Sequence, residues 1–145
     1  MNSAVNNIRF LEPKDKWLLD KEAAIKHWIL NCVELRGFKI AQVDYSFLTN
    51  TEIEALNINL LNHHYPTDII TLDHSNGRRR LRVEMYLGYE FIREYAQKHQ
   101  IDPKEELCRV LVHGLLHCMG WDDKDIDAKN KMRIEEDKCL LSRPN

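Results

Sequence analysis

Hydrophobic positions are densest along residues 107–119, where almost every residue is apolar. A helix that is apolar on all sides is buried, so this segment is predicted to be the central helix of the core. Asp102 is a suitable N-cap, Pro103 suits the first helical position, and Glu105 is spaced as in a capping box. Gly120 tolerates the left-handed conformation and is predicted to end the helix.

Elsewhere, apolar residues either recur at helical spacing or alternate with polar ones between turn-forming residues. These patterns predict strands at 5–11, 38–48, 68–73 and 78–87, and further helices at about 20–35, 49–61, 89–100 and 124–141. Their order indicates one α+β domain over residues 1–145, in which about five helices pack on a mixed four-stranded sheet. The two strands flanking the second helix are candidates for a parallel pair, and 68–87 for an antiparallel hairpin.

Composition narrows the class of protein. The 145 residues are 43% hydrophobic with a net charge of −2, which suits a globular chain without a global basic field for nucleic acid. No apolar run reaches membrane-spanning length and the first residues do not resemble a signal peptide, so no membrane partner and a cytoplasmic location are expected. The four cysteines show no C-x-x-C spacing, as expected of reduced thiols.

Two histidines interrupt the apolar helix. His113 and His117 are four residues apart and therefore share one helix face. Unpartnered imidazoles are costly in a buried helix, and the acidic residues Asp122 and Asp123 follow the glycine that ends it. The pattern predicts a metal site with two imidazole ligands and one carboxylate. The alternative is a pair of hydrogen-bonded core histidines.

Zinc accepts imidazole nitrogen and carboxylate oxygen, and three protein ligands leave one coordination position open, as in catalytic sites. One Zn²⁺ per chain is therefore expected, although another divalent metal would also fit. A zinc peptidase needs a glutamate directly after the first histidine as general base. Here that residue is Gly114, which cannot move a proton, so the peptidase class is disfavoured.

The segment H-G-L-L-H-C-M-G-W-D-D at 113–123 resembles H-G-x-L-H-x-x-G-Y-D-H, the signature of the YbeY-type bacterial endoribonucleases. T-D-I-I-T-L at 67–72 is similar to that family's T-D-V-L-S-F strand, and L-R-V-E-M-Y-L at 81–87 falls where the family has a G-D-I-type strand. The resemblance implies an α+β fold, a bound metal, and cleavage of single-stranded precursor rRNA during maturation of the small ribosomal subunit. The implied partners are RNA and the ribosome.

Carried over by position, His113 and His117 are the first two metal ligands, and His113 belongs to the catalytic centre. The family's third ligand is a histidine, and Asp123 holds that place here. A carboxylate is a competent ligand but makes the metal a weaker Lewis acid. Asp122 is expected to support the ligands, and from the sequence alone the two aspartates could exchange roles.

The family usually carries an arginine in the loop after the second helix, where this chain has His63 and His64. These are either solvated loop residues or contacts for RNA. A replacement cation is Arg109, one turn before His113 on the same helix face. Arg109 is predicted either to contact a phosphate as a catalytic residue or to form a structural ion pair, for example with Glu84.

The remaining basic cluster is Arg78, Arg80 and Arg82, which would share one face of a strand. It is either a phosphate-binding rim for RNA or a hairpin edge protected by charge. The leading hypothesis is a zinc-dependent endoribonuclease. Its rival is a non-catalytic ribosome-assembly factor with a structural metal. The sequence does not decide between hydroxide and the RNA 2′-OH as the attacking group.

Overall fold

The central helix is where the hydrophobic pattern places it. In this computed structural model, which describes residues 3–14, 16–62 and 67–145, α4 spans Pro103–Cys118. The Asp102 carboxylate caps its first turn by accepting the Lys104 amide at 2.9 Å. Glu105, predicted to complete a capping box, instead accepts a hydrogen bond from Arg143 at 3.1 Å. Nearly all of α4 from its second turn onward is buried, so it is the core helix of the domain.

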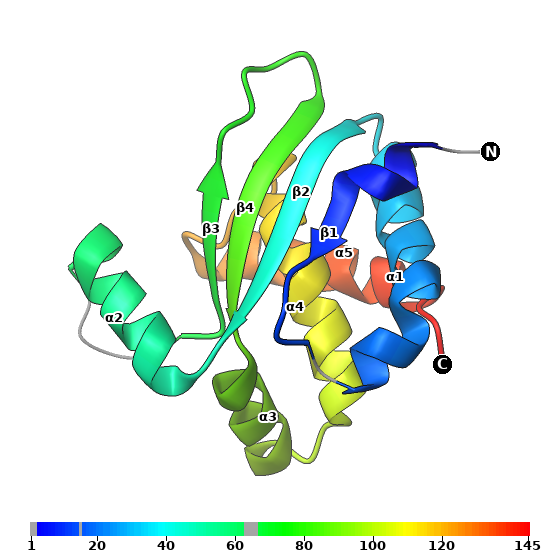
Figure 1. Cartoon of the computed structure of the whole chain (residues 1–145). Coiled ribbons are helices and arrows are strands. Elements are labelled where there is room, and N and C mark those ends of the chain that lie inside the picture. Colours follow the sequence, from blue (N-terminus) through cyan, green and yellow to red (C-terminus); the bar gives the residue numbers. More distant parts are fainter. Residues whose placement is uncertain (1–2, 15, 63–66) are drawn as a thin grey trace.

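The sheet is mixed and four-stranded, as predicted. Its strands are β1 (Ile8–Phe10), β2 (Lys39–Leu48), β3 (Ile69–Asp73) and β4 (Arg80–Gly88), in the order β1-β2-β4-β3 (Figure 1). β1, β2 and β4 are parallel, and β3 is antiparallel to β4. The expected parallel pair on either side of the second helix is wrong, because β4 lies between β2 and β3. β4 buries alternate residues along its whole length, which suits a central strand, whereas β3 is short and largely half-exposed.

The other helices are η1 (Ser3–Asn7), α1 (Lys16–Glu34), α2 (Asn50–Leu61), α3 (Tyr89–Lys98) and α5 (Ile126–Leu140). The first strand is shorter than predicted, because the residues before Ile8 form a 3-10 helix. α2 begins as expected, with a capping box between Thr49 and Glu52. No helix in the part of the chain that the structure describes has the length and apolar character needed to cross a membrane.

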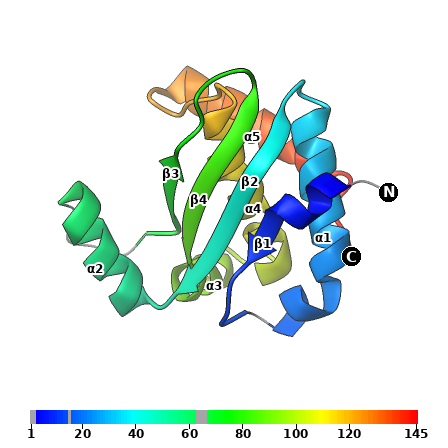
Figure 2. The ribbon, with the colours of Figure 1, turned by 45° about the horizontal axis from the view of Figure 1, so that its top comes forward.

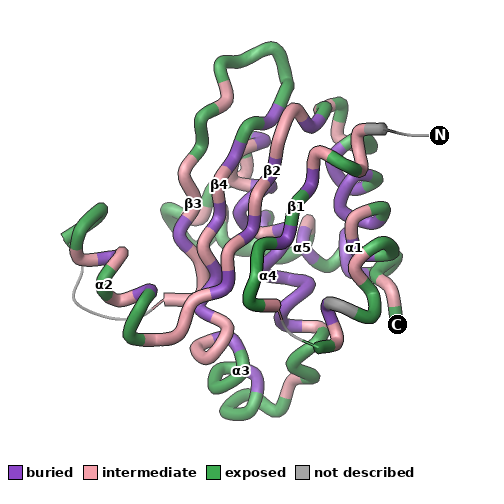
Figure 3. Tube along the Cα trace, in the orientation of Figure 1, coloured by how far each residue is buried: buried purple, intermediate pink, exposed green. Residues whose placement is uncertain are grey.

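Helices α1, α4 and α5 cover one face of the sheet and leave much of the other face open (Figure 2). Buried positions accordingly concentrate on α4, on the sheet and on the inner side of α1 (Figure 3). The buried Tyr45 hydroxyl on β2 donates to the Leu111 carbonyl of α4 at 2.7 Å, which ties the helix to the sheet.

Gly114 lets α4 approach the sheet closely. A Cβ atom at this position would lie 2.7 Å from Met85 Sδ and 2.8 Å from Thr71 Oγ1, closer than real contacts allow. The missing side chain therefore fixes the distance between α4 and strands β3 and β4. Because His113 precedes this glycine, the contact also fixes where the first histidine stands relative to the sheet.

Candidate metal centre

His113, His117 and Asp123 come together at the C-terminal end of α4. The His117 Nε2 atom lies 3.4 Å from Asp123 Oδ2, and His113 Nε2 lies 3.9 Å from the same oxygen. One donor atom from each residue falls within 4.8 Å of the other two. All three side chains are partly exposed, so the group borders solvent.

These distances fit a divalent ion. Three donors about 2.1 Å from a tetrahedral ion lie roughly 3.4 Å from one another, close to the 3.4 and 3.9 Å that separate the two histidines from Asp123. The C-terminal end of a helix also carries partial negative charge, which favours a cation. The donor set is two nitrogens and one oxygen, which suits zinc and other first-row metals.

The turn after α4 brings Asp123, and not Asp122, close to the two histidines. Gly120 has a φ of +111°, and the amide of Trp121 bonds back to the Leu116 carbonyl at 3.0 Å. This reversal returns the chain toward the histidines. Asp122 is exposed and accepts the Lys124 amide at 3.3 Å, so it stabilises the turn and is not part of the group of three.

A buried carboxylate orients His113 from the side opposite the candidate metal. Glu136 of α5 lies 2.6 Å from His113 Nδ1. Because a carboxylate only accepts hydrogen bonds, Nδ1 carries the proton and Nε2 is left free as a ligand. The side chain of Glu136 is only 6% exposed, so this contact is shielded from water.

Arg109 completes this chain of contacts. Its guanidinium binds Glu136 at 3.0 Å and Asp137 at 2.8 Å, and its side chain is 10% exposed. The predicted ion pair is therefore present, but its partners lie on α5. The suggested partner Glu84 is wrong: it bonds His74 at 2.7 Å on the far face of the sheet. Arg109 thus holds Glu136 in place beneath His113.

Electrostatics at the centre follow from this packing. Burial disfavours the charged form of His113, but the hydrogen bond and charge of Glu136 outweigh it, and the pKa of His113 is raised. Asp68 is half-buried and lies near His113. Burial raises the pKa of its carboxyl group, opposed in part by His113.

A hollow of about 240 Å³ adjoins His113. Asp68, Glu106, Arg109, Arg133 and Glu136 are among the residues that line it. Within residues 3–14, 16–62 and 67–145, Arg133 forms no ion pair shorter than 4 Å, so its guanidinium remains available. The hollow therefore borders one candidate ligand, His113, and is lined by a cation that no described carboxylate pairs with.

Sequence reasoning missed Glu136, Asp68 and Arg133. The many charged residues of α5 do not distinguish an inward-facing carboxylate from a solvated one. Glu136 nevertheless lies four residues after Met132 and three before Cys139, and all three are buried. That helical spacing was a usable signal for an inward-facing carboxylate.

The basic hairpin, which carries Arg78, Arg80 and Arg82, lies away from the candidate metal centre. Arg80 and Arg82 alternate with the buried residues Leu81 and Val83 of β4, so they point to the open face of the sheet. Arg78 lies in the preceding turn with a φ of +62°, so the expected strand alignment of all three arginines is wrong. Their RNA-binding role stays a prediction. His63 and His64 lie outside the described residues.

The chain is an α+β protein in which two histidines of a buried helix and a carboxylate of the following turn form a group that could hold a metal ion. The family model described as Endoribonuclease YbeY matches residues 12–143, and the chain belongs to this family. That match confirms the resemblance inferred from the histidine motif.

Individual relatives agree over most of the chain. The Endoribonuclease YbeY of Cytophaga hutchinsonii is 32% identical over 136 residues, covering 94% of this chain and 95% of the relative. That of Parabacteroides distasonis is 32% identical over 124 residues, covering 86% and 87%. The solution structure of TM1509 from Thermotoga maritima superposes with a TM-score of 0.68 at 24% identity, over 93% of this chain and 87% of that one. The last comparison supports the fold.

Proposed function

We propose that the protein is a zinc-dependent endoribonuclease that cuts single-stranded precursor rRNA during maturation of the small ribosomal subunit, in the cytoplasm. The endoribonuclease class follows from membership of the family. The observation that supports the metal dependence is the group of His113, His117 and Asp123 donors within 4.8 Å on a solvent-facing side. The two nitrogens and one oxygen favour zinc as the resident ion.

A bound zinc ion would supply Lewis acidity toward a phosphate oxygen or a water molecule. His113 and His117 would hold it through Nε2, and Asp123 through a carboxylate oxygen. Glu136 keeps the proton of His113 on Nδ1, and Arg109 fixes Glu136. We assign Arg109 this positioning role in place of direct contact with a phosphate, because two carboxylates already occupy its guanidinium.

The hollow beside His113 is the proposed place for an RNA phosphate next to the scissile one, because Glu136 lines it and neither His117 nor Asp123 does. Arg133 is the cation there that no described carboxylate holds within 4 Å, so it is assigned to a non-bridging phosphate oxygen. Asp68 lines the same hollow, where a carboxylate can accept a hydrogen bond from a ribose hydroxyl. Arg78, Arg80 and Arg82 are proposed to bind RNA further along, around the β3 edge of the sheet.

The rival function is a ribosome-assembly factor whose metal only braces the fold. A structural metal would have all its coordination positions filled by protein ligands. The partial exposure of His117 and Asp123 instead favours a site with one coordination position open to solvent.

The test uses purified, zinc-loaded protein with matched single-stranded and double-stranded RNAs of one sequence. The proposal predicts cleavage of the single strand, and loss of cleavage by His117→Ala while the fold is retained. Full retention of cleavage after chelation would exclude the metal-dependent reaction. Absence of cleavage together with unfolding on chelation would favour the assembly factor. A scissile 2′-deoxy substitution that blocks cleavage would identify the 2′-OH as the attacking group.

A further inference from the structure

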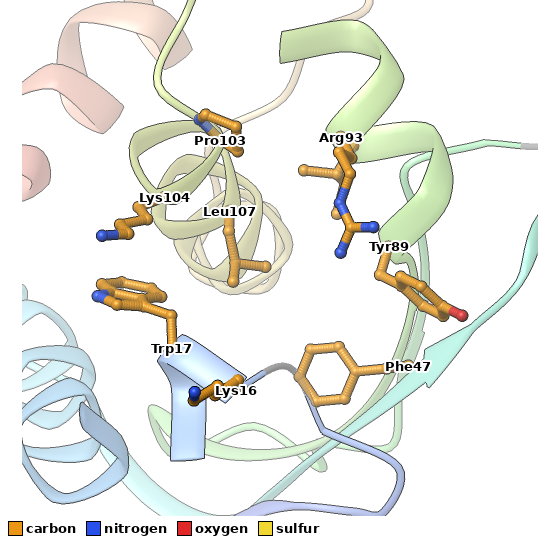
Figure 4. A pocket seen from close by; sticks show the side chains of 9 residues that line it. Lys16, Trp17, Phe47, Tyr89, Arg93, Pro103, Lys104 and Leu107 are labelled. Carbon is orange, nitrogen blue, oxygen red and sulfur yellow. The ribbon is translucent and has the colours of Figure 1, made fainter. Parts of the chain in front are cut away.

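A hollow in the described part of the chain lies apart from the candidate metal residues, none of which lines it. It has a volume of about 300 Å³ and lies where the start of α1, the end of β2, the start of α3 and the start of α4 meet (Figure 4). The volume is at the lower end of the range for small-molecule sites, which suits a ligand of about one nucleotide.

Three aromatic side chains and three cations line this hollow. Trp17, Phe47 and Tyr89 supply the rings, and Lys16, Arg93 and Lys104 the charges. In Figure 4, Trp17 and Tyr89 stand on opposite sides, with Leu107 at the back between them. Trp17 and Tyr89 are partly exposed, so parts of their rings are accessible to a ligand.

The charge of the hollow differs from that of the chain. The protein as a whole has a net charge of −2. None of the described residues that line the hollow is acidic. Lys16 and Lys104 form no ion pair within 4 Å among the residues that the structure describes, and the Lys104 ammonium lies 5.9 Å from the centre of the Trp17 ring. Charge complementarity therefore favours an anionic ligand with a flat apolar part.

The hollow is close enough to the candidate metal centre along α4 for one RNA strand to reach both. Its floor residue Leu107 precedes His113 by six residues, or about 9 Å of helix rise. Ile92 lines both this hollow and the one beside His113. A single strand held at the metal centre can therefore place another nucleotide here.

We propose that this hollow, the Trp17–Lys104 pocket, binds one nucleotide of single-stranded RNA outside the cleavage position. The base stacks on Trp17 or Tyr89, and the adjoining phosphate is held by Lys16 and Lys104. Aromatic rings combined with cations form the usual surface for single-stranded nucleic acid, because every base has a stacking face. The inference rests on the proposed function, since it takes RNA as the ligand.

The test is fluorescence anisotropy with the zinc-loaded full chain and a labelled, cleavage-resistant 2′-O-methyl single-stranded 12-mer. Lys16→Glu/Lys104→Glu is compared with Lys21→Glu/Lys98→Glu, which has the same charge change on exposed parts of α1 and α3. The pocket variant should weaken binding about tenfold or more relative to that control. The corresponding alanine variant should reduce the salt slope by about 0.7, the value for the one phosphate that the two lysines hold.

Stacking is tested separately from charge. Trp17→Phe, which keeps an aromatic face, should retain most of the affinity, whereas Trp17→Leu should lose about tenfold. Equal affinities for the pocket variant and its charge control would overturn the proposal and leave the hollow to another occupant, such as a protein side chain.

Failure of this inference and failure of the proposed function give different results. Cleavage that depends on His117, combined with equal affinities for the pocket variant and its control, removes only the pocket. If the protein never cleaves RNA but the pocket variant binds RNA more weakly than its control, the Trp17–Lys104 pocket is supported as an RNA-binding site and the proposed endoribonuclease activity is excluded.

Discussion

His113 is restrained from both sides of its ring. One nitrogen faces Asp123 and His117, and the other faces Glu136, which Arg109 holds in turn. A single ring in this position couples the metal group to the interior of the domain. Changes two contacts away from the ligands should therefore alter metal binding.

Glu136→Gln should weaken zinc affinity about 10- to 100-fold, because the amide cannot replace the carboxylate that fixes the His113 tautomer. Competition with a chromophoric chelator measures this, with Asp127→Asn on the exposed side of α5 as the matched control. Circular dichroism must confirm that both variants are folded, since Arg109 loses a buried partner. An unchanged zinc affinity in the folded variant would remove Glu136 from the centre.

Glu106 should make stability depend on pH. Glu106 is 7% exposed, and burial raises the pKa of its carboxyl group despite the opposing charges of Arg109 and Arg133. A folded-state pKa above the unfolded value favours the native state below the unfolded pKa, and this contribution is lost as pH rises through the folded pKa. Glu106→Gln should therefore stabilise the protein at pH 7.5 by about 1 kcal/mol, or roughly 2–4 °C in Tm, and by less at pH 4.5. Thermal denaturation giving the same Tm difference at both pH values would refute this account of Glu106.

At the scale of elements, the packing of α4 on β3 and β4 sets the geometry of the centre. Gly114 lies at a close contact between α4 and the sheet. An alanine at this position would favour the helix but crowd the sheet, so its effect on stability shows which of the two is larger. Helix propensity alone favours alanine over glycine by about 1 kcal/mol, whereas overpacking costs about 1–3 kcal/mol.

Gly114→Ala should therefore destabilise the protein, because the new methyl group meets Met85 and Thr71. Urea denaturation measures the loss of unfolding free energy, and Gly114→Ser should cost more because it adds a further atom. An increase of about 1 kcal/mol in the unfolding free energy of the alanine variant would contradict this, because it would mean that the sheet accommodates the methyl group without an overpacking penalty.

The sequence predicts the local helices and strands well, but it does not predict the contacts between them. The apolar run and its cap locate α4 within a residue or two, because local patterns determine a buried helix. The pairing of β2 with β4 is a long-range choice that no local pattern encodes. Glu136 escaped prediction because its buried position depends on how α5 packs on α4. The Trp17–Lys104 pocket draws residues from four elements, so only the tertiary structure brings them together.

At the scale of the whole molecule, the metal centre and the basic hairpin lie on different sides of the sheet. The centre belongs to the face covered by α1, α4 and α5, whereas Arg80 and Arg82 point to the open face (Figure 2). An RNA that contacts both must pass around the β3 edge.

Arg80→Ala/Arg82→Ala should lower the salt slope of single-stranded RNA binding by about 1.4, the value for two lost phosphate contacts. Anisotropy titrations between low and moderate salt measure it, with Lys21→Ala/Lys98→Ala as the charge-matched control. A slope equal to that of the control would leave the two arginines as solvated charges on the open face of the sheet.

The most direct measurement compares two adjacent aspartates of one turn. Zinc content and single-stranded RNA cleavage are determined for Asp123→Ala and Asp122→Ala, both purified with zinc. The account predicts about one zinc ion per chain and retained cleavage for Asp122→Ala, and loss of both for Asp123→Ala. Retention of zinc and cleavage by a folded Asp123→Ala protein would contradict the assignment of Asp123, with His113 and His117, as the ligand set of the catalytic metal.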